Sequence, residues 1–158
     1  MELFVSDLDG TLLNKDQIIS DYSKKELNRL IKTGVNFAIA TARSPATVSE
    51  ILNGIDIKTP VVLMNGVIIF DIEKKKYIDV KEIDKESVKE IIKILQEYNK
   101  TFFLYGIKDD YLWVYHKDFT YDFEREYYEE RCNKPLKSFK RVENYLDVLE
   151  AVSYTHLT

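Results

Sequence analysis

The sequence predicts an α/β fold in which a parallel sheet is followed by a smaller α+β unit. Apolar runs at residues 3–5, 35–40 and 60–64 alternate with segments whose apolar residues recur at helical spacing. Strands that alternate with helices favour a parallel sheet covered on both faces. The rest of the chain has one amphipathic helix and two aromatic-rich, strand-like runs. We therefore expect two units, residues 1–82 and 83–158.

Composition narrows the class of protein. The 158-residue chain has 23 basic and 27 acidic residues, a formal net charge of −4 and no long basic stripe, so we expect no nucleic-acid partner. The single cysteine, Cys132, cannot form an internal disulfide, and the amino terminus lacks the pattern of a secretory signal. No apolar run approaches the ~20 residues of a membrane span. We expect a cytoplasmic protein outside the membrane, and the oligomeric state stays open.

Local signals place the helices of the first unit. Either Ser20 or Ser23 can cap the first helix, and Gly34 stands where a helix end favours a left-handed residue. Ser44 and Pro45 predict the start of a second, short helix, since proline is favoured at the first helical position.

In the second unit, residues 84–100 predict a helix capped by Asp84, and residues 101–106 and 111–115 predict two strands joined by a turn. Aromatic side chains on strands more often pack than bind ligands, so we expect packing.

The two histidines are His116, after a predicted strand, and His156. Neither has a cysteine or an acid cluster beside it, so both are expected at the surface and not as metal ligands.

Two acids, Asp7 and Asp9, stand at the end of the first apolar run. On a strand, residues i and i+2 point the same way, so both carboxylates are expected above one point of the sheet edge. They repel each other unless a cation lies between them or one keeps a proton. A bound Mg²⁺ would leave one as a nucleophile and the other to transfer protons. Gly10 permits a sharp turn, and Thr11 adds donors for an anion. An acidic strand end that only caps a turn is the alternative.

The stretch FVSDLDGTLLN, residues 4–14, resembles the first motif of the haloacid dehalogenase superfamily, hhhhDxDGT, in the form of its phosphatases. FAIATARS is similar to the second motif, with its threonine at Thr41. TAR at residues 41–43 and NGV at residues 65–67 are near matches to the T-G-R and N-G-A of Cof-type (subclass IIB) sugar-phosphate phosphatases. The resemblance covers about residues 1–80; beyond them only the placement resembles the family's inserted cap.

The resemblance implies a Rossmann-like core and specific roles. Asp7 would be the nucleophile that forms an aspartyl-phosphate, and Asp9 the acid and base. Mg²⁺ would bind the Asp7 carboxylate and the backbone carbonyl of Asp9. The residues implied for substrate or phosphate binding are Gly10, Thr11, Thr41, Arg43, Asn65 and Gly66. Two alternatives stay open. Asn65-Gly66 also fits a hairpin turn, and Arg43 can also be a solvated surface charge.

Two departures from the family pattern lower the expected activity. The family's third motif supplies a lysine and its fourth the acids of GDxxND; Lys134 matches the third only superficially, and the sequence has no GDxxND. In Cof-type proteins both motifs lie beyond the cap, so we expect a chain truncated at its carboxyl end. Residues 153–158, SYTHLT, are similar to a translated sequencing adapter, and we expect them to be non-native.

These patterns lead to one expected function and two alternatives. The expected function is Mg²⁺-dependent hydrolysis of a small phosphorylated metabolite, a sugar phosphate, with little or no turnover by this chain alone. The alternatives are a phosphomutase or phosphotransferase of the same superfamily, and a non-catalytic module that binds a phosphorylated ligand.

Overall fold

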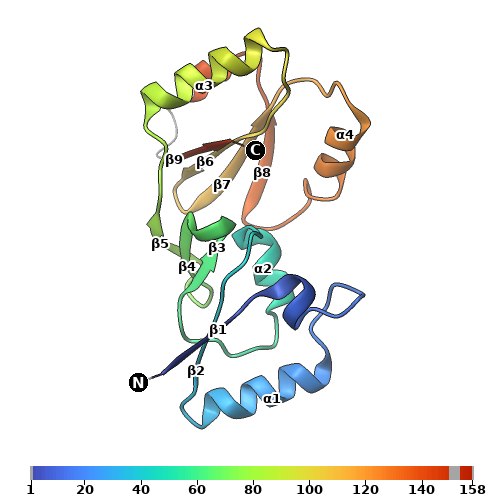
Figure 1. Ribbon diagram of the computed structural model, residues 1–158, viewed down its shortest axis with the longest axis vertical. Helices are drawn as coiled ribbons and strands as arrows, with labels where there is room; N and C mark the ends of the chain where they lie inside the picture. Colours follow the sequence, from blue (N-terminus) through green and yellow to red (C-terminus); the bar gives the residue numbers. More distant parts are fainter. Residues whose placement is uncertain (1, 150–153, 158) are drawn as a thin grey trace. The chain divides into compact units, whose positions relative to one another are not determined.

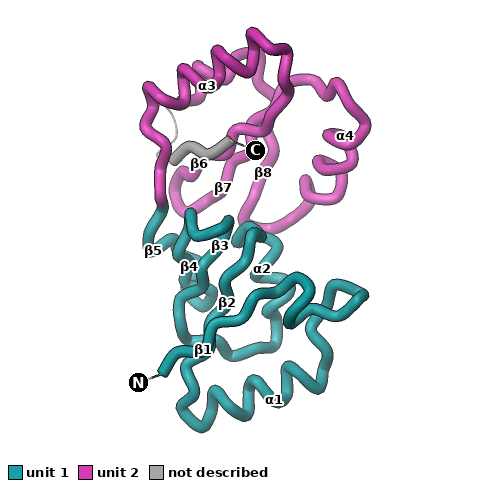
Figure 2. Tube along the Cα trace, in the orientation of Figure 1, with its two compact units in different colours: residues 1–80 teal, residues 81–158 magenta. Residues whose placement is uncertain are grey.

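The computed structural model describes residues 2–149 and 154–157 (Figure 1). The chain divides into two compact units, Met1–Val80 and Lys81–Thr158, called here the first and the second unit (Figure 2). Their assignment as catalytic core and cap stays a prediction. Across the described residues, no helix is both long enough and apolar enough to cross a membrane.

Parallel strands lie at the centre of the first unit. Strand β1 (Leu3–Ser6) pairs in parallel with β2 (Asn36–Ile39). A parallel bridge between Ala40 and Val62 joins the end of β2 to β3 (Val61–Leu63). The predicted order of three parallel strands is confirmed, and their carboxyl ends meet at one edge.

The helices of the first unit are α1 (Asp21–Lys32) and α2 (Pro45–Ile51). The Ser20 hydroxyl caps α1 by accepting a hydrogen bond of 3.1 Å from the backbone N–H of Ser23, which settles the choice between the two serines. Gly34 follows α1 with φ +95°, as the sequence predicts for a helix end.

Strand β3 also forms an antiparallel sheet with β4 (Ile68–Asp71), which pairs with β5 (Lys76–Val80). The hairpin alternative for Asn65-Gly66 is therefore confirmed. Its turn is not the two-residue type that the Asn-Gly pair suggests, because Leu63 pairs with Ile68 and the loop between them contains the 3₁₀ turn η2 (Met64–Gly66). Strand β5 was not predicted, since its residues alternate only weakly.

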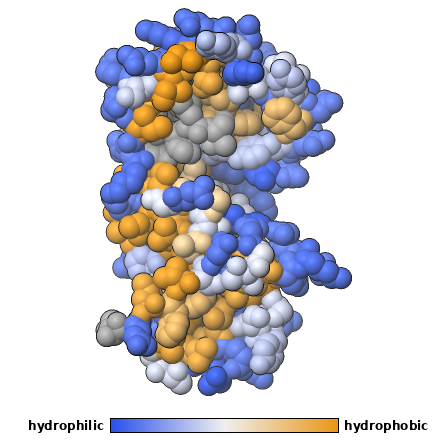
Figure 3. Space-filling view, in the orientation of Figure 1, coloured by the Kyte–Doolittle hydropathy of each residue, from blue (hydrophilic) through white to orange (hydrophobic). Residues whose placement is uncertain are grey.

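Strand β1 leaves one edge open. Leu3, Phe4 and Val5 are 56%, 55% and 54% exposed, and among the described residues β1 pairs only with β2. Figure 3 shows apolar side chains gathered on the visible face of the first unit around this strand. An unpaired apolar edge is a template for another strand, so we expect the isolated chain to associate.

The second unit contains a four-stranded sheet in the order β8-β7-β6-β9. β6 (Leu104–Lys108) and β7 (Tyr111–His116) form an antiparallel hairpin around Asp109 and Asp110, a tighter turn than predicted. β8 (Lys137–Arg141) lies parallel to β7, and β9 (Tyr154–Leu157) lies antiparallel to β6.

Strand β9 falls within the segment expected to be non-native. Ser153, Thr158 and the side chain of His156 lie outside the described residues, so the expectations for them stay predictions.

Helices cover both faces of this sheet. α3 (Lys85–Glu97) is capped by Asp84 as predicted, through a 2.9 Å hydrogen bond from the N–H of Ser87. α3 and α5 (Leu146–Leu149) contribute to one apolar cluster. Its buried members are Val88, Ile92, Phe102, Leu104, Tyr115, Tyr145 and Leu149.

Helix α4 (Asp122–Glu129) covers the other face with an aromatic cluster. Its rings belong to Phe103, His116, Phe119, Tyr127, Tyr128 and Phe139. These aromatic residues pack as expected, and Phe103, His116 and Phe119 also line a cavity of the second unit. The surface prediction for His116 is wrong: it is 9% exposed and stacks on Phe119 at 4.7 Å, because the β7 register turns it under α4.

Candidate active site

The two acids follow β1 and do not lie on it. β1 ends at Ser6, and residues Leu8–Leu12 form one wide helical turn, η1, closed by a 2.9 Å hydrogen bond from the Leu13 N–H to the Leu8 carbonyl. Leu8 is fully buried, whereas Asp7 and Asp9 are exposed. The strand placement predicted for the acids is therefore wrong, but the turn buries only Leu8 between them and leaves both carboxylates exposed.

The turn has a feature expected of an anion-binding loop. Gly10 adopts φ +73°, and a Cβ there would meet no atom within 4 Å, so glycine is needed for conformation and not for space. Thr11 is exposed on the same turn. Asp7 Oδ1 accepts a 2.7 Å hydrogen bond from the Leu8 N–H, and its other oxygen accepts none from the described residues.

Backbone hydrogen bonds tie the loop after β2 to the loop after β3. Thr41 is buried, its N–H donates to the Val62 carbonyl at 3.0 Å, and its hydroxyl accepts from the Arg43 N–H at 3.3 Å. The N–H of Met64 donates to the Arg43 carbonyl, and that of Asn65 to the Thr41 carbonyl, both at 3.2 Å. The second and third predicted site segments are thus held side by side.

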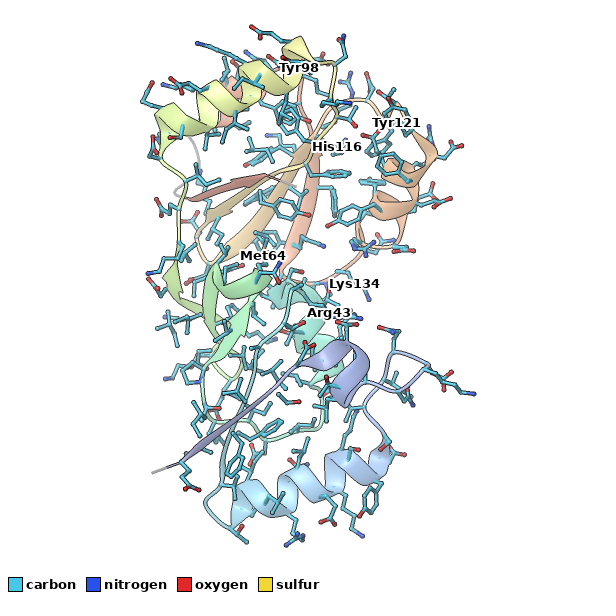
Figure 4. All side chains as sticks on the ribbon, in the orientation of Figure 1. Arg43, Met64, Tyr98, His116, Tyr121 and Lys134 are labelled. Atoms are coloured by element: carbon cyan, nitrogen blue, oxygen red, sulfur yellow. The ribbon has the colours of Figure 1, made fainter. Side chains whose placement is uncertain are left out.

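Arg43 connects these loops to the first one. Its Nε donates to Asp9 Oδ2 at 2.8 Å and its Nη2 to Asp9 Oδ1 at 2.5 Å, a bidentate pair. Figure 4 labels Arg43. Nη2 also donates to Gln17 Oε1. The hydrogen bonds from Arg43 hold the pKa of Asp9 below its ordinary value, and those to Asp9 raise the pKa of Arg43. Arg43 is therefore no solvated charge.

The structure brings together some predicted residues and not others. Asp9 contacts Arg43, and Thr41 and Asn65 share a backbone hydrogen bond. Asn65 and Gly66 are exposed, with φ +56° and +91°. Between the described residues, Asp7 makes no side-chain hydrogen bond to Thr41 or Asn65. Sequence analysis missed Gln17, which lies in an irregular loop with no motif to reveal it.

The donor set fits Mg²⁺ in part. A free Asp7 oxygen is a ligand that this ion prefers, and the ligand predicted at Asp9 is its backbone carbonyl, since Arg43 binds both oxygens of the Asp9 carboxylate. Mg²⁺ commonly binds one or two carboxylates plus water and phosphate oxygens. Within the described residues, no three His, Cys, Asp or Glu side chains gather as a metal cluster. The Asp9–Arg43 pair competes with any cation for Asp9.

A cavity of about 650 Å³ lies elsewhere, in the second unit. None of the predicted site residues lines it. Its lining includes Phe102, Phe103, His116, Lys117, Phe119 and Glu124.

Fold and loop geometry define a Rossmann-like α/β protein with an acidic loop after its first strand. The profile of the haloacid dehalogenase-like hydrolases matches residues 4–157. The chain belongs to this family, and its resemblance to the Cof-type subclass IIB is confirmed.

Individual relatives agree with this assignment. The 5-amino-6-(5-phospho-D-ribitylamino)uracil phosphatase YwtE of Bacillus subtilis is 34% identical over 112 residues, 71% of this chain and 37% of that protein. The crystal structure of TM0651 from Thermotoga maritima is 25% identical, covers 98% of this chain and 54% of that one, and has a TM-score of 0.69. The subclass IIB sugar phosphatase BT4131 shares the fold at 19% identity, with a TM-score of 0.57 over 88% of this chain and 52% of that one. The chain spans less than half the length of the curated relatives it matches.

The Asp9–Arg43 pair gives a direct prediction. In the wild-type chain, the Asp9 carboxyl carbon followed by ¹³C NMR is expected to titrate below the ordinary aspartate pKa of about 3.9. Arg43→Gln removes both charged donors, so the pKa of Asp9 should rise toward that value. Asp16→Asn, an exposed substitution on the same loop region, is the matched control and should leave the Asp9 titration unchanged. An unchanged Asp9 titration in Arg43→Gln would contradict the pair.

Proposed function

We propose that the chain is the amino-terminal part of a Mg²⁺-dependent phosphatase that hydrolyses a small phosphorylated metabolite, a sugar phosphate, through an aspartyl-phosphate on Asp7. The observation that carries this is the exposed Asp7 carboxylate, with one oxygen free of hydrogen bonds, in a glycine-containing turn after the first parallel strand. Family membership supports the same chemistry.

The first step is displacement at phosphorus. An Asp7 oxygen forms a bond to phosphorus, the bond from phosphorus to the ester oxygen breaks, and the leaving oxygen takes a proton from Asp9. In the second step Asp9 takes a proton from water, the water oxygen bonds to phosphorus, and the bond to Asp7 breaks. Inorganic phosphate leaves and both carboxylates return to their starting state.

The remaining groups position the phosphoryl and neutralise its charge. The Thr41 hydroxyl and the N–H groups of the Gly10–Thr11 turn are the donors available for its oxygens. Mg²⁺ would be held by Asp7 and Asp9, and when bound it neutralises charge on the transferring group.

Arg43 sets a condition on this mechanism. As the pair stands, Asp9 is held ionised and cannot donate a proton. Before the first step, Arg43 therefore has to release Asp9, by moving away or by turning to the substrate, and Asp9 has to take up a proton from water. We propose that substrate phosphate draws the guanidinium away, since phosphate is itself a bidentate partner for arginine.

Beryllofluoride tests the nucleophile without turnover, because it binds carboxylates as a mimic of a phosphoryl group. We expect binding to the wild-type chain, seen by ¹⁹F NMR, to require Mg²⁺ and to vanish in Asp7→Asn. Asp16→Asn, on the exposed loop, is the matched control and should bind normally. Binding that persists in Asp7→Asn would refute the assignment of the nucleophile.

A non-catalytic phosphate-binding module is the second candidate, and the Arg43–Asp9 pair favours it. Two unneutralised carboxylates beside a phosphate would oppose binding, but Arg43 neutralises one of them. This candidate predicts phosphate binding without metal that survives Asp7→Asn. A phosphotransferase or phosphomutase would show itself by a phosphorylated sugar product when an acceptor sugar competes with water.

A further inference from the structure

A buried lysine stands at the start of β8 in the second unit. Lys137 is 3% exposed and pairs in register with Leu112 of β7. Residues that pair in register on two strands point to the same face of the sheet, so Lys137 lies on the same face as Leu112. Phe139, two residues further along β8, lies on this face as well. This is the face that α4 covers with aromatic rings.

The Lys137 ammonium has no anionic partner there. Its Nζ lies 5.2 Å from the centre of the Phe139 ring, and within residues 2–149 it makes no hydrogen bond or ion pair. Buried lysines commonly reach solvent with the ammonium while the stem packs. Because Lys137 is only 3% exposed, its ammonium cannot reach solvent in this way, and the charge is largely shielded from water.

The charged groups that act on Lys137 are cations. They are Arg131 and Lys134, in the segment between α4 and β8; Figure 4 labels Lys134. The Arg131 guanidinium lies 4.1 Å from the centre of the Tyr127 ring, and the Tyr127 and Phe139 rings are 6.4 Å apart. Burial, and then these two cations, lower the pKa of Lys137 to about 8.

Arg131 is partly neutralised already. It forms a 2.5 Å ion pair with Glu130, whose side chain is largely exposed. This acid does not reach Lys137, since Lys137 forms no ion pair within residues 2–149. The Lys137 ammonium therefore stays poorly hydrated and without an anionic partner within residues 2–149.

We propose that Lys137, with Arg131 and Lys134, forms an anion-binding site in the second unit that takes the phosphate or carboxylate group of a small molecule. An oxyanion would supply the charge-assisted hydrogen bonds that Lys137 lacks. The site uses no residue of the first unit, so it does not depend on chemistry at Asp7.

The test follows the proton on Lys137 in the wild-type chain. The pKa of each lysine is measured by ¹H–¹³C NMR of the Cε groups, with and without inorganic phosphate, at constant ionic strength held with chloride. An anion that binds only the protonated ammonium increases its proton affinity about tenfold when present at about ten times its dissociation constant. We expect a saturable rise of this size for Lys137, both in the wild-type chain and in the control Lys140→Met, which replaces an exposed lysine on the same strand.

Variants and a second anion separate the possible outcomes. Lys137→Met identifies the signal, and Arg131→Gln should weaken the phosphate response severalfold. Acetate in place of phosphate tells whether the site prefers a carboxylate. Asp7→Asn should keep the full response, so failure of the proposed catalytic function would leave this result intact. A Lys137 titration that neither phosphate nor acetate changes, or that chloride changes equally, would overturn the site.

Discussion

The chain alone is expected to release phosphate from sugar phosphates at least about 10⁴-fold more slowly than a full-length member of its family. The sequence contains no GDxxND and no convincing third-motif lysine. Removing one preorganised electrostatic group typically costs about 10²–10³ in rate, and here two are missing. The open edge of β1 adds to the loss, because among the described residues no second strand pairs with β1 on that side to support the segment before Asp7.

The measurement is Mg²⁺-dependent phosphate release from a panel of sugar phosphates, with Asp7→Asn of the same chain as the background control. A full-length relative is assayed in parallel. Release that disappears in Asp7→Asn and comes within about 100-fold of the relative would show that one strong electrostatic group at most is missing. The cost assigned to the absent motifs would then be wrong.

Lys137→Met is expected to stabilise the second unit by about 1–3 kcal/mol at pH 7. Replacing even a buried ion pair by apolar side chains of similar volume is often neutral or stabilising by about 1–4 kcal/mol, and Lys137 lacks the partner that would offset its burial. The chain's single tryptophan, Trp113, lies on β7 and reports urea unfolding of this unit alone. Lys140→Met, at an exposed position of β8, is the control and should change the free energy of unfolding by less than about 0.5 kcal/mol.

The free energy of unfolding of the second unit should depend on pH in a defined direction. The folded pKa of Lys137 is about 8, and an unfolded lysine titrates at about 10.4, so between these values the unfolded chain binds more protons. The free energy of unfolding should therefore rise with pH through this window. Burial raises the pKa of Tyr145 to about 12, so its contribution falls above pH 10, where the unfolded tyrosine ionises first.

Comparison with Lys137→Met isolates the lysine, because both chains keep Tyr145. The stability difference between the two chains should be constant below pH 8 and shrink toward pH 10. A variant less stable than the wild type at pH 7 would mean that the ammonium makes a favourable contact in the folded chain.

Local signals predicted the elements that depend on near neighbours. The caps of α1 and α3 use a side chain and an N–H three residues away, so Ser20 and Asp84 could be assigned from spacing. Irregular or weakly patterned segments were missed. β5, α4 and β8 lack a clear period of 2 or 3.6, and tertiary pairing forms them.

The sequence by itself determined the family, the three parallel strands and the order of the site segments, since strand and helix periods and the DxDGT-type motif are local patterns. Tertiary structure alone decided that Arg43 binds Asp9 across 34 positions, that His116 is buried, and that Lys137 lacks an anion. Those facts follow from sheet register and loop packing, which bring distant residues together and have no signature in the spacing of neighbours.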